Sequence, residues 1–420
     1  MADRTIDHLI VGGGVAGFSC AKTLREAGAD GTIALVTRDP DAPYDRTAVS
    51  KGYLQGATAR EATLLAPPEW WEENGVELLV RTSALALDPE ARTVKLSNKT
   101  TVEYGQLLLA TGANIRRLRV DGSDLEGIHY VRALGNADAI RRDVEGVENV
   151  VLVGGSYIAT EVAASLTSLG TRCALVMQEG VTLERAVGEE AGRFFQKVLE
   201  DHGVEVHGDD EVERFEGEDG RVTTVVTKSG RRLPADAVVV GAGVMPDVML
   251  AQRAGLEIGP RGGVVTDASL RTSAPGVFAA GDMAEYESVV HGGDRVRIEH
   301  WDVAEQQGAT AAHAMLGGDR VHDVVPYFFS DLADWSSMEY VGAAREWDEE
   351  IVRGSTAAAA FTVWYLHGGR VVGALSVGRG DDLDAARELI LAGAPVDEAG
   401  RAALADPAAS LEALGAAGAS

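Results

Sequence analysis

Two glycine-rich segments, each placed directly after a short apolar run, constrain the fold of this chain more than any other feature. The first reads Gly-Gly-Gly-Val-Ala-Gly over residues 12–17, and the second reads Gly-Gly-Ser-Tyr-Ile-Ala over residues 154–159. A glycine-rich turn between a strand and a helix is typical of a βαβ unit that binds nucleotide phosphates. Two such turns predict two nucleotides on one protein. A flavin and a nicotinamide nucleotide make chemical sense together, because one can transfer a hydride to the other.

The first segment meets every requirement of the dinucleotide pattern. Gly12 permits the sharp turn out of the strand, Gly14 lets the backbone approach a pyrophosphate, and Gly17 allows the helix to pack against the strand. The helix that follows, expected over 18–27, would present its free N–H groups to the phosphates. Asp39 stands at the end of the next predicted strand, where an acid for the ribose hydroxyls is expected. The alternative, a tight turn without a nucleotide, explains fewer of these features.

The second segment departs from the pattern at two positions. Ser156 replaces the close-approach glycine, and Ala159, an accepted variant, replaces the packing glycine. The surrounding βαβ pattern is intact, and Glu179 lies near the position of the ribose acid. No basic residue stands immediately there to pair with a 2′-phosphate, which favours NADH, although Arg172 and Arg185 are close enough in sequence to leave NADPH possible. A domain that keeps the fold and has lost its nucleotide is the alternative.

Composition sets the outer bounds. The 420 residues predict two or three domains, and 38 basic against 65 acidic residues give a net charge of −27. This charge argues against nucleic acid and anionic membranes as partners. The sequence contains no long apolar run and no leader pattern at its start, so we expect no membrane span, no signal peptide and a cytoplasmic location. The nine histidines are scattered, so no metal site is expected, and Cys20 and Cys173 are predicted to be buried.

The order of the segments predicts an α/β fold with two Rossmann-like dinucleotide-binding domains, for FAD and NAD, and a C-terminal α+β domain. The expected boundaries are 1–113 with 247–324 for a discontinuous FAD domain, 114–246 for the NAD(P)H domain and 325–420 for the C-terminal domain. Alternating patterns predict strands over 360–365 and 370–377. Asp406 and Pro407 predict the N-cap and first turn of a last short helix.

These motifs, in this order, resemble the ferredoxin-reductase-like flavoproteins, a group that includes oxygenase-coupled ferredoxin reductases, rubredoxin reductases and apoptosis-inducing factor. Residues 110–112 match the closing turn of the flavin domain, and residues 272–282 match the second flavin signature. The segment from Pro43 to Lys51 matches a Pro-Tyr-Arg-Ser-Lys segment of the family. The resemblance covers essentially the whole chain, and it implies FAD on the first glycine segment and NAD(P)H on the second.

The resemblance also implies roles for individual residues. Asp282 would bind the ribityl chain, Arg46 would meet the FAD phosphates, and Lys51 would lie near flavin N5. Glu161 would face the nicotinamide and pair with Lys51, and these two are the expected catalytic residues. Trp301 fits a packing role as well as a flavin contact. The expected cofactor-binding residues are Gly12, Gly14, Ala16, Gly17, Asp39, Arg46, Lys51, Thr111, Gly112, Arg132, Gly281, Asp282, Glu299, Trp301, Gly154, Ser156, Ile158, Ala159, Glu179 and Gly243.

The positions of the two cysteines exclude reactions that need a thiol beside the flavin. Relatives that reduce disulfides carry two cysteines close together, and the peroxidase and coenzyme A disulfide relatives carry one where this chain has Ala42. The expected reaction is therefore hydride transfer from NADH to flavin N5, with Lys51 as a cationic neighbour, followed by electron transfer to an external acceptor.

The sequence leaves the acceptor open among three alternatives. The resemblance favours a ferredoxin that serves an oxygenase, and the net charge disfavours an acidic ferredoxin unless a local basic patch exists. A reductase of small acceptors (quinone, a radical or dioxygen) is the second alternative. Its motivation includes Phe329 and Leu332, where the family often has Trp and Gln. A redox-gated binding protein like apoptosis-inducing factor is the third, and either a monomer or a homodimer is expected.

Overall fold

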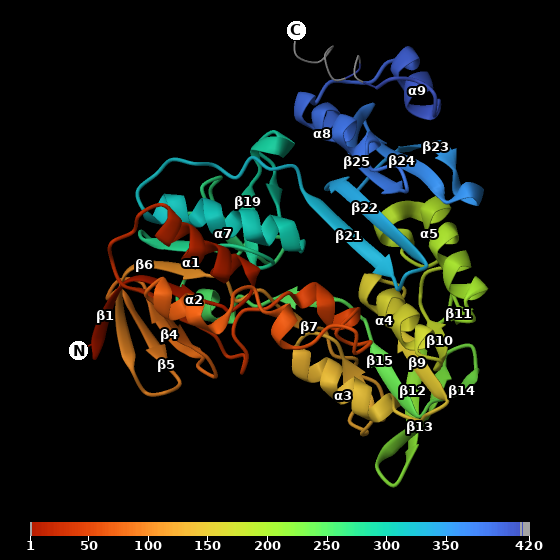
Figure 1. Cartoon of the computed structure of the whole chain (residues 1–420), viewed down its shortest axis with the longest axis horizontal. Coiled ribbons are helices and arrows are strands. Elements are labelled where there is room, and N and C mark those ends of the chain that lie inside the picture. The colour runs from red at the N-terminus through yellow and green to blue at the C-terminus, as the bar shows by residue number, and fades with distance from the viewer. Residues whose placement is uncertain (1, 412–413, 415–420) are drawn as a thin grey trace. The chain divides into compact units, whose positions relative to one another are not determined.

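In the computed structural model, which describes residues 2–411 and 414, the chain divides into two units (Figure 1). The first unit consists of Met1–Arg46, Glu61–Asn114 and Val244–Pro326, and the second consists of Thr47–Arg60, Ile115–Gly243 and Tyr327–Ser420. The segment that carries Lys51 therefore belongs to the second unit, although segments of the first unit flank it in sequence. The three-domain boundaries expected from the sequence stay a prediction.

A seven-stranded sheet forms the centre of the first unit, in the order β3-β2-β1-β6-β5-β4, with β18 also paired to β6. Its strands are β1 (Arg4–Val11), β2 (Ile33–Val36), β3 (Val76–Leu79), β4 (Ala84–Asp88), β5 (Thr93–Leu96), β6 (Thr101–Leu109) and β18 (Val277–Ala279). The pairs that join β3, β2, β1, β6 and β18 are all parallel, whereas β5 pairs antiparallel with β6 and β4. Parallel strands joined by helices are the arrangement that the two glycine segments predict.

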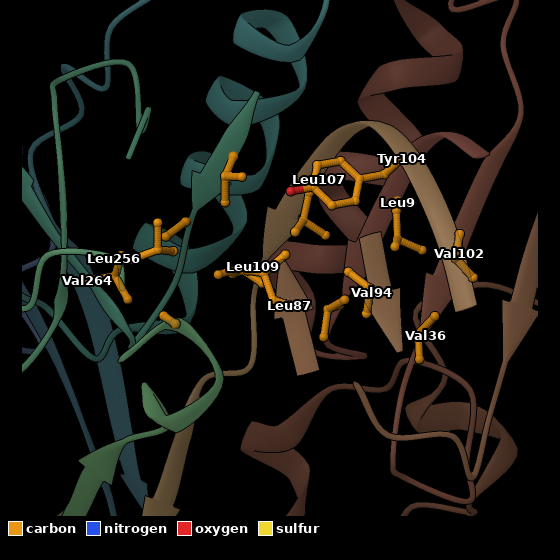
Figure 2. Close-up of a cluster of buried hydrophobic side chains, with 14 of the residues drawn as sticks. Leu9, Val36, Leu87, Val94, Val102, Tyr104, Leu107, Leu109, Leu256 and Val264 are labelled. Carbon is orange, nitrogen blue, oxygen red and sulfur yellow. The ribbon is translucent and has the colours of Figure 1, made fainter. Parts of the chain in front are cut away.

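Apolar side chains of this sheet pack into a core cluster to which later parts of the chain contribute. Figure 2 shows Leu9, Val94 and Leu107 within it, together with Leu256 and Val264 from the returning segment. All five side chains are buried. Burial of this surface joins the discontinuous pieces of the first unit into one folded body.

The helices of the first unit include α1, which follows the first glycine segment. It begins at Val15, rather than at the expected residue 18, because Gly14 already serves as its N-cap, and it packs against α7 (Figure 1). The helices of this unit are α1 (Val15–Glu26), α2 (Pro68–Glu73), α6 (Met249–Arg253) and α7 (Trp301–Met315). Its shorter strands are β16 (Val244–Pro246), β17 (Val264–Thr266), β19 (Ala284–Glu287) and β20 (Arg295–Val296). Strand β7 (Ala113–Ile115) lies where the chain passes from the first unit to the second.

The second unit contains a five-stranded parallel sheet in the order β11-β10-β9-β15-β8 and a three-stranded antiparallel sheet. The strands are β8 (Ile128–Tyr130), β9 (Asn149–Val153), β10 (Arg172–Val176), β11 (Glu205–His207), β12 (Val212–Glu218), β13 (Arg221–Thr227), β14 (Arg232–Pro234) and β15 (Ala237–Val240). The helices are α3 (Leu134–Val144), α4 (Tyr157–Ser168) and α5 (Glu184–Asp201). This part confirms the second Rossmann-like arrangement.

The C-terminal part of the second unit is an antiparallel sheet in the order β21-β22-β25-β24-β23 with helices beside it. Its elements are β21 (Tyr327–Leu332), β22 (Ser336–Gly342), β23 (Glu349–Ser355), β24 (Ala360–His367), β25 (Arg370–Val377), α8 (Asp382–Ala392) and α9 (Glu398–Ala405). The strands predicted over 360–365 and 370–377 are present as β24 and β25, and the expected α+β architecture of this part is confirmed. No helix in the described part of the chain is long and apolar enough to cross a membrane.

The expected opening of a helix at Asp406 and Pro407 is wrong, because the preceding helix ends at Ala405, residues 407–408 form a turn and residue 409 forms a bend. Residues 412–413 and 415–420, onto which that expected helix would extend, lie outside the described residues. Its N-cap is Asp397, whose carboxylate accepts a hydrogen bond from the Gly400 N–H at 2.8 Å. The buried Arg353 guanidinium donates to carbonyl oxygens at and beyond the helix end. Asp406 therefore closes a helix instead of opening one.

Candidate functional site

Parallel strands of the first unit end together at one edge of the sheet. Val11 at the end of β1 is in register with Val36 of β2 and with Leu109 of β6. Leu109 is in turn in register with Ala279 of β18. The four loops that follow these strands therefore start side by side, outside the carboxyl ends of the strands, where ligands of α/β sheets bind. These loops and the first turn of α1 carry Gly12, Gly14, Ala16, Gly17, Asp39, Thr111, Gly112, Gly281 and Asp282.

The glycines of the first segment differ in what limits them. Gly12 has φ +133°, and a Cβ there would lie 1.9 Å from the Ala110 carbonyl oxygen. A Cβ on Gly17 would lie 2.0 Å from the Gly12 carbonyl oxygen. Gly14 instead has φ −87°, and no heavy atom lies within 4 Å of where its Cβ would be. The fold itself therefore requires glycine at positions 12 and 17. Gly14 faces open space, which leaves room for a pyrophosphate to approach the backbone.

Asp39 and Arg46 form an ion pair in the first unit, and Arg46 also donates to the Tyr44 hydroxyl at 2.8 Å. Burial opposes the charge of Arg46, but Tyr44, Asp39 and Asp282 outweigh it and raise the pKa of this guanidinium above its ordinary value. The acid expected for the ribose and the arginine expected for the phosphates are thus brought together with Asp282. Their pairing was not anticipated from the sequence, because the two residues lie in different loops.

The N-terminal half of α7 carries two buried side-chain nitrogens that have no hydrogen-bond partner among the described residues. Gln307 is buried, and its Oε1 accepts a hydrogen bond from the Gly281 N–H at 2.8 Å. Its Nε2 and the Trp301 Nε1 are buried without a hydrogen-bond partner among the described residues. Buried donors of this kind are costly unless a ligand or water satisfies them. They fit the polar edge of a bound flavin, and they place Trp301 at the first turn of the helix.

Other expected residues of the first unit are held by local contacts. Arg297 pairs with Glu299 at 2.5 Å and donates to the Asp282 carbonyl oxygen at 3.0 Å. The Thr111 hydroxyl donates to the Asp247 carbonyl oxygen at 2.6 Å. Glu299 and Asp282 are therefore linked through one arginine.

The second glycine segment repeats the geometry of the first. Strands β9, β10 and β15 end in register at Val153, Val176 and Val240. Gly154 has φ +112°, and a Cβ there would lie 2.5 Å from the Gly241 carbonyl oxygen. Ser156 adopts φ −88° and ψ 175°, close to the Gly14 values of −87° and −177°.

The serine that departs from the glycine pattern does not block the second loop. Its hydroxyl donates to the Gly241 carbonyl oxygen at 3.1 Å, so the side chain is tied to the loop that follows β15. Ala159 is fully buried, and a Cβ on Gly241 would lie 2.9 Å from the Ala159 Cβ. The close approach of these two segments therefore requires small residues at both positions. Gly243 has φ +83°, and Ile158 is partly exposed on the first turn of α4.

Glu179, the candidate ribose acid of the second unit, forms an ion pair with Arg185 at 2.9 Å. The Glu179 side chain is 19 % exposed, whereas that of Arg185 is 73 % exposed, so the arginine is the more solvated partner of the two. Arg132 also lies in the second unit, between β8 and α3.

A buried carboxylate, Glu161 on α4, accepts from three donors that come from two other segments of the second unit. Its Oε1 accepts from the Lys51 ammonium at 2.9 Å, so the expected ion pair is present. Its Oε2 accepts from the Ser50 hydroxyl at 2.5 Å, and the Ser330 hydroxyl of β21 donates to Oε1 at 2.6 Å. The Lys51 nitrogen also lies 5.4 Å from the centre of the Phe329 ring. The contacts of Ser50 and Ser330 with Glu161 could not be predicted, because no local sequence pattern relates either serine to this glutamate.

The two cysteines are free, buried thiols, as expected. Cys20 on α1 lies 3.7 Å from the Met315 sulfur, and burial raises its thiol pKa well above the ordinary value. Burial likewise raises the pKa of Cys173 to about 11. Neither thiol is poised to react as a thiolate.

Comparisons with known proteins agree with this geometry. Residues 6–308 match the family model described as pyridine nucleotide-disulphide oxidoreductase, and residues 327–415 match the one described as reductase C-terminal. The chain is 35 % identical over 373 residues to a ferredoxin–NAD(P)(+) reductase of Sphingomonas sp, covering 89 % of each chain. It is 32 % identical to putidaredoxin reductase of Pseudomonas putida, covering 93 % of this chain and 92 % of that protein.

Solved structures give the same result. A ferredoxin reductase from Rhodopseudomonas palustris superposes with a TM-score of 0.91 at 31 % identity, covering 98 % of this chain and 100 % of that one. A chain of the covalent putidaredoxin reductase–putidaredoxin complex superposes with a TM-score of 0.92 at 31 % identity, covering 100 % of both chains.

Proposed function

This chain belongs to the pyridine nucleotide-disulphide oxidoreductase family, and we propose that it carries electrons from NADH to a ferredoxin-type iron–sulfur protein that serves an oxygenase. It is an FAD- and NAD(P)H-dependent reductase that works without a redox-active disulfide. When bound, FAD accepts a hydride from the nicotinamide and releases the electrons one at a time. The residues of the protein bind the two nucleotides and hold charge beside them.

The first unit would hold FAD at the shared edge of its sheet. Gly14 leaves room for the pyrophosphate, and the N–H groups at the start of α1 point to the same place. Arg46 supplies positive charge for the phosphates, and Asp39 supplies an acceptor for the ribose. The buried, unpartnered nitrogens of Gln307 and Trp301 would bind polar atoms of the flavin.

The Lys51–Glu161 pair is the observation that carries the proposal. Lys51 is 18 % exposed and Glu161 is 5 % exposed, and a largely buried ion pair of this kind is costly to maintain without a role in function. We assign the Lys51 ammonium to the flavin side, where it offsets negative charge that develops during reduction. Glu161 keeps that ammonium in place and faces the nicotinamide.

A preference for NADH follows from Glu179. A carboxylate at the end of β10 accepts hydrogen bonds from ribose hydroxyls and repels a 2′-phosphate. Its partner Arg185 is largely exposed, so the carboxylate remains the fixed group at this position. We therefore assign NADH as the preferred donor.

The names of the relatives support a ferredoxin as the acceptor, since several are reductases of ferredoxins in oxygenase systems. The test is NADH-driven reduction of cytochrome c by the FAD-loaded protein, with and without a ferredoxin that contains a two-iron cluster. We expect the rate to depend on ferredoxin and to exceed the rates with quinone or dioxygen alone. Equal rates without ferredoxin would identify a reductase of small acceptors and overturn the proposal.

A further inference from the structure

We propose that Ser330, on the C-terminal sheet, is a positioning residue that fixes the Glu161 carboxylate for oxidation of NADH. This inference rests on the proposed function, because Glu161 is assigned there to the nicotinamide side. Ser330 would touch neither nucleotide. It would act only through Glu161, and through Glu161 on Lys51.

The hydrogen bond from Ser330 is buried and short. Its hydroxyl donates to Glu161 Oε1 at 2.6 Å, and Ser330 is only 2 % exposed. The same oxygen accepts from the Lys51 ammonium at 2.9 Å. Hydrogen bonds to a charged group are stronger and more directional than those between neutral groups. The Ser330 hydroxyl therefore helps to decide which way the carboxylate oxygen that holds Lys51 points.

Packing of β21 on α4 sets the position of Ser330. Phe328 lies two residues earlier on the strand, so the two side chains share a face of the sheet. The Phe328 ring makes an edge contact with Tyr157, the first residue of α4, at 5.0 Å between ring centres. Glu161 lies one turn further along that helix. The aromatic contact thus brings the serine opposite the carboxylate.

The opposite side of the carboxylate is fixed by a different segment. The Ser50 hydroxyl donates to Glu161 Oε2 at 2.5 Å, and the Ser50 carbonyl oxygen accepts from Ser165 at 2.8 Å. With both serines present, each carboxylate oxygen has a hydroxyl donor, and rotation about the last side-chain bond would break both hydrogen bonds. Without Ser330, Lys51 would be the one remaining side-chain donor to Oε1 among the described residues.

The experiment compares the wild-type protein with the Ser330→Ala and Ser330→Thr variants, all loaded with FAD. Anaerobic stopped-flow mixing with NADH gives the limiting rate of flavin reduction and the apparent Kd for NADH. Calorimetry gives the Kd of NAD⁺ and of ADP-ribose, which lacks the nicotinamide. We expect Ser330→Ala to lower the limiting rate about tenfold, since a hydrogen bond to a charged group is lost. It should also weaken NAD⁺ and leave ADP-ribose binding unchanged, and Ser330→Thr should restore most of the rate.

Ser337→Ala is the matched control. Ser337 lies on the adjacent strand β22, and its hydroxyl donates to Asp331 at 2.6 Å, so the same kind of bond is removed at an exposed site. This variant should behave like the wild type.

Two results would overturn the inference. One is a Ser330→Ala protein with wild-type reduction and wild-type NAD⁺ binding. The other is equal weakening of NAD⁺ and ADP-ribose without rescue by threonine, which would indicate a purely structural role. Failure of the proposed function is a separate result, seen in the wild-type protein itself: either NADH does not reduce it, or its NADH-driven reduction of cytochrome c does not depend on ferredoxin.

Discussion

Lys51 and Glu161 form a largely buried ion pair whose loss should affect both stability and the proposed chemistry. Glu161 is nearly inaccessible to solvent, and its carboxylate oxygens accept from Lys51, Ser50 and Ser330. Removing one partner of a buried pair leaves the other charge poorly solvated, which costs more than the pair itself contributes. The two serines reduce that cost, because they continue to donate to the carboxylate.

Replacement of Lys51 by alanine should therefore lower the free energy of unfolding by about 2 kcal/mol. Lys197→Ala is the control, because its i,i+4 pair with Asp201 is largely exposed and should contribute less than about 0.5 kcal/mol. Denaturant unfolding of the apoproteins measures both values. Equal effects of the two substitutions would show that the Lys51 pair is as solvated as a surface pair.

His322 of the first unit provides a pH-dependent term in stability. Both ring nitrogens are buried without a hydrogen-bond partner among the described residues, and the ring lies edge-on to Tyr286 at 5.2 Å. Burial lowers the pKa of His322 to about 4 from its ordinary 6.5. The unfolded chain therefore takes up a proton at a higher pH than the folded protein.

Stability from His322 is fully present above about pH 6.5 and is lost as the pH falls toward 4. The difference between the two pKa values corresponds to about 3 kcal/mol at most. His322→Phe keeps a ring against Tyr286 and should flatten this part of the pH dependence. Unfolding free energies measured at several pH values for both proteins provide the check, and parallel curves would contradict the assignment.

At the level of elements, the two glycine segments show how far local sequence determines the site. Both strand–turn–helix units could be predicted, because each requires glycine within a few residues for steric reasons that the sequence displays directly. The partners of Glu161 could not be predicted. Ser50 and Ser330 lie 111 and 169 residues away from it in sequence, and only tertiary packing of β21 on α4 brings Ser330 there.

Local signals also failed where tertiary contacts compete with them. Asp406 and Pro407 have the composition of a helix start, yet Arg353 binds carbonyl oxygens in that region and the helix ends before them. The Asp39–Arg46 ion pair was likewise not anticipated, because the two residues lie in different loops, and the role of Asp39 toward a ribose stays a prediction. The roles assigned to individual cofactor-binding residues stay predictions.

The two glycines Gly14 and Gly12 should respond differently to alanine. Gly14→Ala places a methyl group in open space, so the apoprotein should keep its unfolding midpoint while FAD binding weakens at least about tenfold, because the methyl group displaces the pyrophosphate. Gly12→Ala forces a Cβ onto the Ala110 carbonyl and should destabilise the fold by several kcal/mol, on the order of 3 or more. Thermal unfolding and FAD titration of both variants test this. Unchanged FAD affinity in Gly14→Ala would place the cofactor elsewhere.

For the whole molecule, each unit carries one glycine segment and one carboxylate, Asp39 or Glu179, that is predicted to bind a ribose. The first unit gathers the groups expected around FAD, and the second gathers those expected around the nicotinamide. Lys51 belongs to the second unit by its contacts, together with Ser50 and with Tyr53, whose hydroxyl donates to Asp138 at 2.7 Å. The chain thus keeps its proposed catalytic lysine with the nicotinamide-binding elements.

The most direct test of the proposed electron transfer is anaerobic stopped-flow mixing of the FAD-loaded protein with NADH or NADPH, followed by flavin absorbance. We expect rapid bleaching by NADH and slower bleaching by NADPH. Lys51→Met should lower the limiting rate about tenfold or more, because it removes the ammonium that we propose to lie beside the flavin. Wild-type protein that NADH does not bleach, or a Lys51→Met variant reduced as fast as the wild type, would contradict it.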